Sequence, residues 1–257
     1  MHFYVVKSKT LKLFFIFIML AVIMSINFFE NGFVLADVFF YKSTRKIPIY
    51  CVERTDKKIA LTFDAAWGSD KTKSILEELK RNGVTATFFL VGMWVDKNED
   101  LVKEIDACGF EIGTHSNTHP DLTKLDRSQI ELELSVSTNK IEKITNKKVK
   151  NFRAPYGAYN NTLIEIADSL KLKTIQWDVD SLDWKGISAS QINFNILKKV
   201  KSGSIILCHN NSDYILEALP GLILSLKSRG YSFETVDSLI YQDNFSIDST
   251  GKQIKNN

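Results

Sequence analysis

The chain has 257 residues, of which 44% are hydrophobic and 25% charged, so it is long enough for a full hydrophobic core and its composition is that of a globular protein. Its net charge of +3 falls to +1 when the three lysines and one glutamate of residues 1–36 are set aside, and this near-neutral body gives no support for nucleic-acid binding. The three cysteines have no Cys-x-x-Cys spacing, which argues against a disulfide scaffold or a cysteine zinc site, and we expect them to be small buried apolar residues.

Residues 1–36 have the pattern of a targeting segment. Lys7 and Lys9 precede an apolar run over residues 11–29, and small residues follow near Ala36. The run is long for a signal peptide and short for a membrane span, so both a cleaved signal and a retained anchor fit, whereas the flanking charges disfavour a buried core helix. The lysines predict that the N-terminus lies on the inner side of the membrane and the body on its outer side. Residues 37–56 form a lead-in segment.

From residue 57 to 240, short apolar runs alternate with amphipathic segments. This alternation predicts one α/β domain with parallel strands, either a barrel or an open doubly wound sheet. Asp126 and Gln129 have the spacing of a helix capping box. Residues 241–257 form a polar tail, which we expect to be frayed from about residue 243. The expected strands are 59–63, 85–91, 110–114, 151–153, 172–177, 204–207 and 231–236, and the expected helices are 70–81, 99–108, 126–145, 160–170, 189–201 and 213–229.

Polar side chains follow five of the expected strands. In α/β barrels the chemistry lies on the loops after the carboxyl ends of the strands, so these side chains are candidates for an active site. They are Asp64, His115 and His119, Arg153, Asp180 and Asp183, and His209.

The spacing of His115 and His119 lets two imidazoles converge on one metal ion, either on a helix face or on a tight loop. Pro120 follows directly and favours the loop. The alternative is a pair of solvated loop histidines. No phosphate-binding Gly-rich loop, dinucleotide fingerprint or Gly-x-Ser-x-Gly elbow is present in the sequence, so a nucleotide site and a serine hydrolase are not indicated.

Taken together, the strand-end motifs over residues 57–240 resemble the polysaccharide deacetylase superfamily, with its NodB homology domain, also called carbohydrate esterase family four. The resemblance implies a distorted (β/α) barrel. The Phe63 to Gly68 variant of the first motif is similar to a sporulation-associated branch that acts at the cell wall. The matching motifs are Thr62-Phe63-Asp64, His115 to His119, Arg153-Ala154-Pro155-Tyr156-Gly157, Asp180 to Trp184, and Leu207-Cys208-His209.

The resemblance implies a divalent metal, zinc by preference, held by His115 and His119, which makes bound water nucleophilic. It makes Asp64 the general base and Arg153 the residue that keeps Asp64 ionised and oriented. The structural alternatives are a helix-capping role for Asp64 and a strand-end salt bridge for Arg153.

The remaining roles implied by the resemblance concern the substrate and the leaving group. The backbone N–H of Tyr156 shares the developing oxyanion, and His209 donates a proton to the leaving amine while Asp183 fixes its tautomer. Leu207 and Trp184 form the apolar pocket for the acetyl methyl, although Trp184 could also be plain core packing.

One position departs from the family pattern. Ala65 stands where the resemblance places a second aspartate as third metal ligand, and an alanine cannot bind a metal. Water could fill the gap, another carboxylate such as Asp70 or Asp121 could reach in, or Asp64 could bind the metal and give up its role as base.

The leading hypothesis is a metal-dependent hydrolase that removes N-acetyl groups from amino sugars of peptidoglycan or a related cell-wall polysaccharide, outside the membrane. The alternative is a non-catalytic glycan-binding or wall-remodelling protein with a degenerate metal site. A third possibility is deacylation of a small amide. The expected partners are a polysaccharide and, through the N-terminal segment, a membrane.

Overall fold

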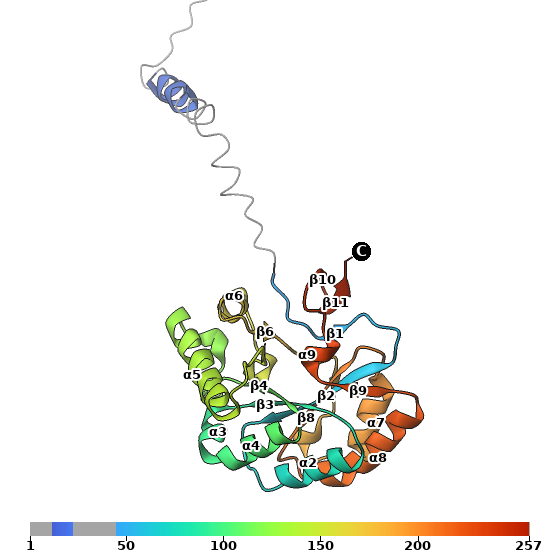
Figure 1. Cartoon of the computed structure of the whole chain (residues 1–257). Helices are drawn as coiled ribbons and strands as arrows, with labels where there is room; N and C mark the ends of the chain where they lie inside the picture. The colour runs from blue at the N-terminus through green and yellow to red at the C-terminus, as the bar shows by residue number, and fades with distance from the viewer. Residues whose placement is uncertain (1–11, 23–44, 257) are drawn as a thin grey trace, which may run out of the picture. The chain divides into compact units, whose positions relative to one another are not determined.

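The computed structural model describes residues 12–22 and 45–256 (Figure 1). The chain divides into two units, Met1–Thr44 and Arg45–Asn257. Residues 12–22 are helical. In the two described stretches, no helix has the length and apolar character needed to cross a membrane. The signal peptide or anchor expected over residues 1–36 falls largely outside the described residues, so it stays a prediction.

The second unit is built on a parallel sheet. Its strand order is β6-β5-β4-β3-β2-β8-β7, and a further strand, β9 (Ser232–Glu234), pairs with the first residues of β2. Each neighbouring pair along this order is parallel. The strands are β2 (Lys58–Ala65), β3 (Thr87–Leu90), β4 (Glu111–Thr114), β5 (Asn151–Phe152), β6 (Lys173–Thr174), β7 (Val179–Asp180) and β8 (Ile205–His209).

The two end strands of this order come close together. Only residues 175–178 separate β6 from β7 in the chain, so the edges of the sheet lie within the short reach of that segment. The lead-in segment helps to close the gap, because Gln176 N donates to Ile49 O at 2.7 Å and Val52 N donates to Gly203 O at 2.9 Å. The distorted (β/α) barrel expected from the sequence is confirmed, and the single strand expected over 172–177 is replaced by this β6-to-β7 crossing.

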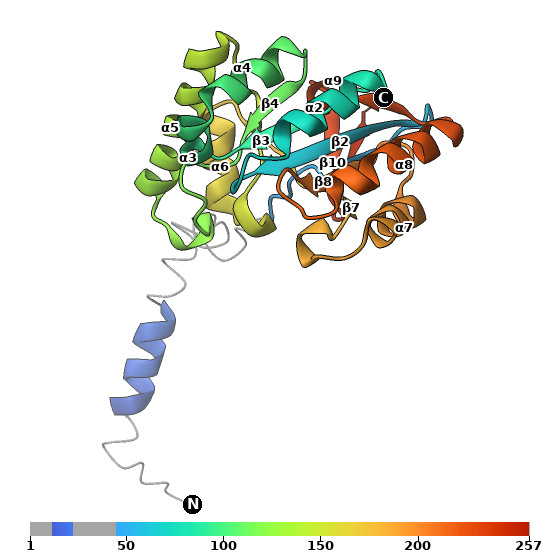
Figure 2. The ribbon, with the colours of Figure 1, turned by 90° about the horizontal axis from the view of Figure 1, so that it is seen from below.

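The helices surround the sheet in the order of the strands they follow (Figure 2). Each helix packs on the next in the order α7, α8, α2, α4, α5 and α6, and α3 packs against α5. The capping box at the start of α5 is formed by Asp126 and Gln129, as expected. The α-helices are α2 (Thr72–Arg81), α3 (Gly92–Lys97), α4 (Glu99–Ala107), α5 (Arg127–Thr145), α6 (Asn161–Ser169), α7 (Ala189–Lys199), α8 (Ile215–Ser228) and α9 (Val236–Leu239); three-residue 3-10 helices cover Leu122–Lys124, Pro155–Gly157 and Asp183–Lys185.

The alternation of side chains along β2 and β8 positions the site. Successive side chains of a strand point to opposite faces. On β2, Ile59, Leu61 and Phe63 belong to the main core cluster with residues of the helices, whereas Ala60 belongs to a second cluster with Phe89 of β3. Thr62 and Asp64 share the face of Ala60. The sheet therefore aims Asp64 into the barrel and not into the helix layer.

The expectation of a frayed C-terminus is wrong. Strand β10 (Phe245–Ile247) pairs antiparallel with β11 (Lys252–Lys255), which pairs in parallel with β1 (Cys51–Val52). Gln253 is fully buried, and its side-chain amide exchanges two hydrogen bonds of 2.8 Å with the backbone of Tyr241. The compact unit thus extends to both sides of residues 57–240. The sequence concealed this because strands of three and four residues carry too little alternation to be recognised.

Candidate active site

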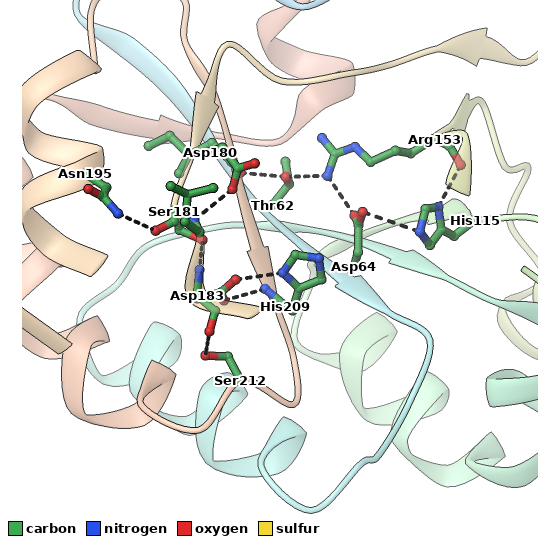
Figure 3. Close-up of polar contacts among 12 residues, drawn as sticks. Thr62, Asp64, His115, Arg153, Asp180, Ser181, Asp183, Asn195, His209 and Ser212 are labelled. Atoms are coloured by element: carbon green, nitrogen blue, oxygen red, sulfur yellow. Dashed lines mark hydrogen bonds and ion pairs between the residues drawn. The ribbon is translucent and has the colours of Figure 1, made fainter. Parts of the chain in front are cut away.

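A pocket of about 740 Å³ opens at the carboxyl end of the parallel strands. Arg153 lies beneath its floor with no exposed surface. Figure 3 shows how Asp64, His115, Arg153, Asp183 and His209 converge there. The other residues predicted from the sequence all line this pocket: Asp64, His115, His119, Tyr156, Asp183, Trp184, Leu207 and His209.

Asp64 is held by a buried cation. Arg153 Nη1 donates to Asp64 Oδ1 at 2.8 Å, and the Asp64 side chain is only 5% exposed. Burial alone raises the pKa of Asp64, but the positive charge of Arg153, assisted by the neighbouring His115 and His209, outweighs it and holds the pKa below its ordinary value. Asp64 is therefore ionised at neutral pH and presents its second oxygen, Oδ2, to the pocket side.

Arg153 is fixed by the barrel interior on every side. Its Nη1 also donates to Thr62 Oγ1 at 2.7 Å, and Nη2 donates to Gln176 O at 3.1 Å. The guanidinium carbon lies 4.2 Å from the centre of the Phe89 ring and 5.6 Å from that of Trp177. These contacts leave the guanidinium one orientation, which sets the position of Asp64 in turn.

His115 follows strand β4 and has a defined tautomer. Its Nδ1 lies 2.7 Å from the backbone oxygen of Arg153, and because a carbonyl only accepts, Nδ1 carries the hydrogen. The lone pair of Nε2 then faces Asp64 Oδ2 at 3.5 Å. Burial lowers the pKa of His115, so the imidazole is neutral and can act as a ligand.

His119 lies on a tight loop, as the following proline predicted. Ser116 and His119 both have left-handed backbone angles, with φ of 67° and 62°. Ser116 Oγ accepts from His119 N at 3.0 Å, and the carboxylate of Glu133 on α5 accepts from the backbone N–H groups of Asn117 and Thr118 at 2.9 and 2.8 Å. Burial and the nearby His115 lower the pKa of His119 to about 4, and its buried Nδ1 has no hydrogen-bond partner among the described residues.

His209 at the end of β8 is paired with Asp183. The His209 Nδ1 lies 2.7 Å from Asp183 Oδ1, and the backbone N–H of His209 donates to Asp183 Oδ2 at 2.8 Å. Burial lowers the pKa of His209, but the hydrogen bond and charge of Asp183, with the charges of Asp64 and Asp180, raise it above its ordinary value overall. The other ring nitrogen, Nε2, can therefore carry a proton that it donates.

Tyr156, Trp184 and Leu207 form the mouth and wall of the pocket. Tyr156 is 71% exposed, has a left-handed φ of 61°, and donates its hydroxyl to His119 O at 3.3 Å. Trp184 is exposed as well, so it is not a core residue in this structure. Leu207 is buried on the face of β8 that also carries His209. The neighbouring Cys208 points to the helix layer, where burial raises its thiol pKa, so it is not a nucleophile.

The third metal ligand is missing. Ala65 is fully buried and packs in the main core cluster. Asp121 caps a 3-10 helix through Thr123, and the Asp70 side chain is largely exposed beside Lys71; neither lines the pocket. Among residues 12–22 and 45–256, no three histidine, cysteine or acidic side chains are grouped to hold a metal ion. The residues present supply two imidazoles and do not make the three-ligand set of a catalytic zinc.

Sequence reasoning assigned no role to Thr62, Glu133 or Trp67. Thr62 accepts a hydrogen bond from Arg153 and donates its own hydroxyl to Ile206 O at 2.6 Å. Its position two residues before Asp64, on the same face of the strand, could have indicated this role from the sequence. Glu133 fixes the histidine loop from a separate helix, which no local pattern indicates. Trp67 lines the pocket beside His119, with 6.0 Å between the two ring centres.

Comparison with known proteins identifies relatives that match most of the described fold. The peptidoglycan-N-acetylglucosamine deacetylase PgdA of Listeria monocytogenes is 36% identical over 211 residues, which are 82% of this chain and 44% of PgdA. The peptidoglycan-N-acetylmuramic acid deacetylase PdaA of Bacillus subtilis is 32% identical over 204 residues, which are 78% of each protein. The chain spans 62% and 44% of the length of two curated relatives.

A solved structure is similar at the level of the fold. BA3943 of Bacillus anthracis, a CE4 family pseudoenzyme, has a TM-score of 0.73 and 36% identity, covering 75% of this chain and 68% of BA3943. A mutant of BA3943 has restored enzymatic activity. The polysaccharide deacetylase family matches residues 52–175, which include the strands that carry Asp64, His115 and Arg153. With PdaA matched over most of its length, these likenesses show that the chain belongs to the polysaccharide deacetylase family, CE4.

Proposed function

We propose that this chain hydrolyses N-acetyl groups on amino sugars of peptidoglycan or a related wall polysaccharide. One observation carries the proposal: Asp64 and His209 are direct partners in the register of β2 and β8, and each side chain has its own fixed partner, Arg153 or Asp183. An ionised carboxylate and an imidazole whose pKa is raised thus meet at one pocket, which is the arrangement that amide hydrolysis requires.

The side chains divide the reaction between them. Asp64 takes a proton from the attacking water as the water oxygen bonds to the acetyl carbonyl carbon. His209 gives a proton to the amide nitrogen as the carbon–nitrogen bond breaks, which leaves acetate and a free amino sugar. The backbone N–H of Tyr156 donates to the oxygen that becomes negative, and Leu207 and Trp184 enclose the acetyl methyl.

The metal is the part of the family pattern that this chain does not complete. The resemblance implies a divalent ion at His115 and His119, zinc by preference. Two imidazoles alone bind such an ion weakly, because catalytic zinc normally has three protein ligands. We therefore assign no step to a metal and expect any activity of the natural chain to be low.

Acetate release tests the proposal. The full chain is incubated with N-acetylated cell-wall fragments, with zinc, without zinc and with a chelator. Release of acetate that requires intact Asp64 supports the proposal, and an increase with oligosaccharide length excludes a small amide as the substrate. If no condition gives release, the hydrolase is refuted.

A second function is favoured by one specific observation. Ala65 removes a ligand, and the similar protein BA3943 is a pseudoenzyme, so a glycan-binding protein without catalysis fits the same pocket. Retained binding of wall glycan with no acetate release by the natural chain, and a gain of release in Ala65→Asp, would establish this second function.

We also propose that the protein works outside the cytoplasmic membrane, tethered or secreted through residues 1–36, and that it acts in sporulation. The lysines before an apolar run support the first part, and the likeness of the Phe63 to Gly68 motif supports the second. Protease added to intact cells should degrade residues 45–257, and protection of this unit would contradict the location. Expression confined to growing cells would contradict the role in sporulation.

A further inference from the structure

Trp67 is an exposed indole at the mouth of the pocket that no role above uses. It is 59% exposed, and its ring lies edge-on to His119 with an interplanar angle of 65°. Three of the largely exposed aromatic side chains in residues 45–256 line this single pocket. In residues 45–256 these largely exposed aromatic side chains are Trp67, Tyr156, Trp184, Phe194 and Tyr214, of which the first three line the pocket. Clustering of exposed apolar rings at a pocket marks a binding surface.

The turn that carries Trp67 is rigidly held. The oxygen of Gly68 accepts hydrogen bonds from Trp94 Nε1 at 2.6 Å and from Asn210 Nδ2 at 3.0 Å. Asn210 is fully buried and also donates to Thr72 Oγ1 at 3.0 Å. Gly68 has a φ of 62°, which a residue with a side chain rarely adopts. The backbone that presents Trp67 is therefore fixed by the fold, and little backbone entropy is lost when a ligand packs on the indole.

The charge of the pocket limits what can pack there. Its lining contains four aspartates, Asp64, Asp180, Asp183 and Asp213, and no lysine or arginine among the described residues. Asp64 and Asp183 are balanced by Arg153 and His209. Among the described residues, Asp213 has one long ion-pair contact, 3.9 Å to Lys71, and Asp180 accepts a hydrogen bond from the backbone of Leu182. The remaining negative charge repels a carboxylate on the ligand.

We infer that Trp67 is a stacking surface for an uncharged N-acetylhexosamine residue of the glycan, which lies over His119. This inference rests on the proposed function and specifies its substrate. The apolar C–H face of a pyranose ring matches the exposed face of an indole, and the hydroxyl and acetamido groups at the ring edge remain available to the polar groups of the pocket. A sugar that carries a carboxylate is disfavoured at the same place.

Binding measurements separate this role from catalysis. The full chain and its Trp67→Ala, Trp67→Phe and Phe194→Ala variants are titrated with a β-1,4-linked N-acetylglucosamine hexamer in a calorimeter. Phe194 is the matched control, because it is 56% exposed and lies outside the pocket. We expect Trp67→Ala to raise Kd by about tenfold or more, in the range of an aromatic hot spot, while Trp67→Phe retains most of the affinity and Phe194→Ala changes nothing.

The results distinguish the two proposals. If Trp67→Ala binds as tightly as the natural chain, the stacking role is overturned and the hydrolase is untouched. If Trp67-dependent binding is seen but acetate is never released, the stacking role stands and the hydrolase fails. If the natural chain does not bind the hexamer, the stacking role fails, and acetate release from cell-wall fragments decides the hydrolase separately. A matched oligomer with muramic acid residues that bear free carboxylates should bind at least several-fold more weakly, and equal binding would overturn the preference for an uncharged sugar.

Discussion

Arg153 donates a hydrogen bond of 2.8 Å to Asp64 while its guanidinium is completely enclosed in the barrel interior. Taking two charges out of water is costly, and the pair is tolerated because Thr62 and the backbone of Gln176 accept two further guanidinium hydrogens, while the buried Nε has no hydrogen-bond partner among the described residues. The same contacts hold the carboxylate of Asp64 ionised at the pocket. The stability of the barrel and the ionised state of Asp64 thus depend on the same ion pair.

Loss of this ion pair should strongly destabilise the protein. Arg153→Met leaves Asp64 buried without its partner, and we expect the free energy of unfolding to fall by about 3–5 kcal/mol. Arg127→Met is the control, because Arg127 contacts Glu165 at 3.6 Å on the surface and its loss should cost about 1 kcal/mol or less. Urea denaturation of both variants measures the difference, and equal losses would show that the interior pair has no special weight.

The contact between His209 and Asp183 should make stability and rate depend on pH. The folded-state pKa of His209 is raised, so the contact stabilises the fold fully below the unfolded value of 6.5, and this stability is lost as pH rises through the folded pKa. In Asp183→Asn that loss should disappear, and the alkaline limb of acetate release should move to lower pH. Denaturation midpoints and rates measured across this range test both effects, with Asp168→Asn as a surface control. Superimposable pH profiles would argue against the assigned acid.

Restoring a third ligand should strengthen metal binding. Ala65→Asp adds the carboxylate that the family pattern places beside the two histidines, and we expect zinc affinity to rise by at least about tenfold, since even outer-shell partners of metal ligands change affinity that much. Ala65→Asn is the control, because asparagine has nearly the same size and shape as aspartate and crowds the core equally but carries no charge. Calorimetric zinc titration compares the two variants, and equal affinities would mean that the site is built differently.

The C-terminal hairpin should be part of the stable fold. Gln253→Ala leaves the partly buried N–H and C=O of Tyr241 without this partner, so the free energy of unfolding should fall by about 1–3 kcal/mol. Gln191→Ala removes an exposed amide on α7 and should stay within about 0.5 kcal/mol of the natural chain. If Gln253→Ala were as stable as this control, the hairpin would make no contribution to folding.

The sequence predicted those parts of the site that are encoded locally. Asp64 and His209 could be found because each ends an apolar run, and the end of a parallel strand is where a barrel places its chemistry. Pro120 correctly indicated a loop for the histidine pair. The capping box at Asp126 identified the start of α5 for the same reason, since all of its atoms lie within four residues.

The parts that the sequence concealed depend on distant contacts. Glu133 acts on a loop that precedes it by about fifteen residues, and β11 pairs with β1 from the other end of the domain as well as with its neighbour β10. The burial of Ala65 follows from the alternation along β2, but its consequence for the metal depends on where Asp70 and Asp121 lie. These contacts are determined by tertiary packing, which cannot be predicted from periodicity and local motifs.

The most direct test of the central claim compares acetate release by the natural chain, Asp64→Asn, His209→Ala and the surface control Asp168→Asn on N-acetylated cell-wall fragments. We predict that the natural chain and the control release acetate at the same rate, and that loss of the base or the acid lowers this rate by about a hundredfold or more. Unchanged release in both Asp64→Asn and His209→Ala would contradict the hydrolase described here.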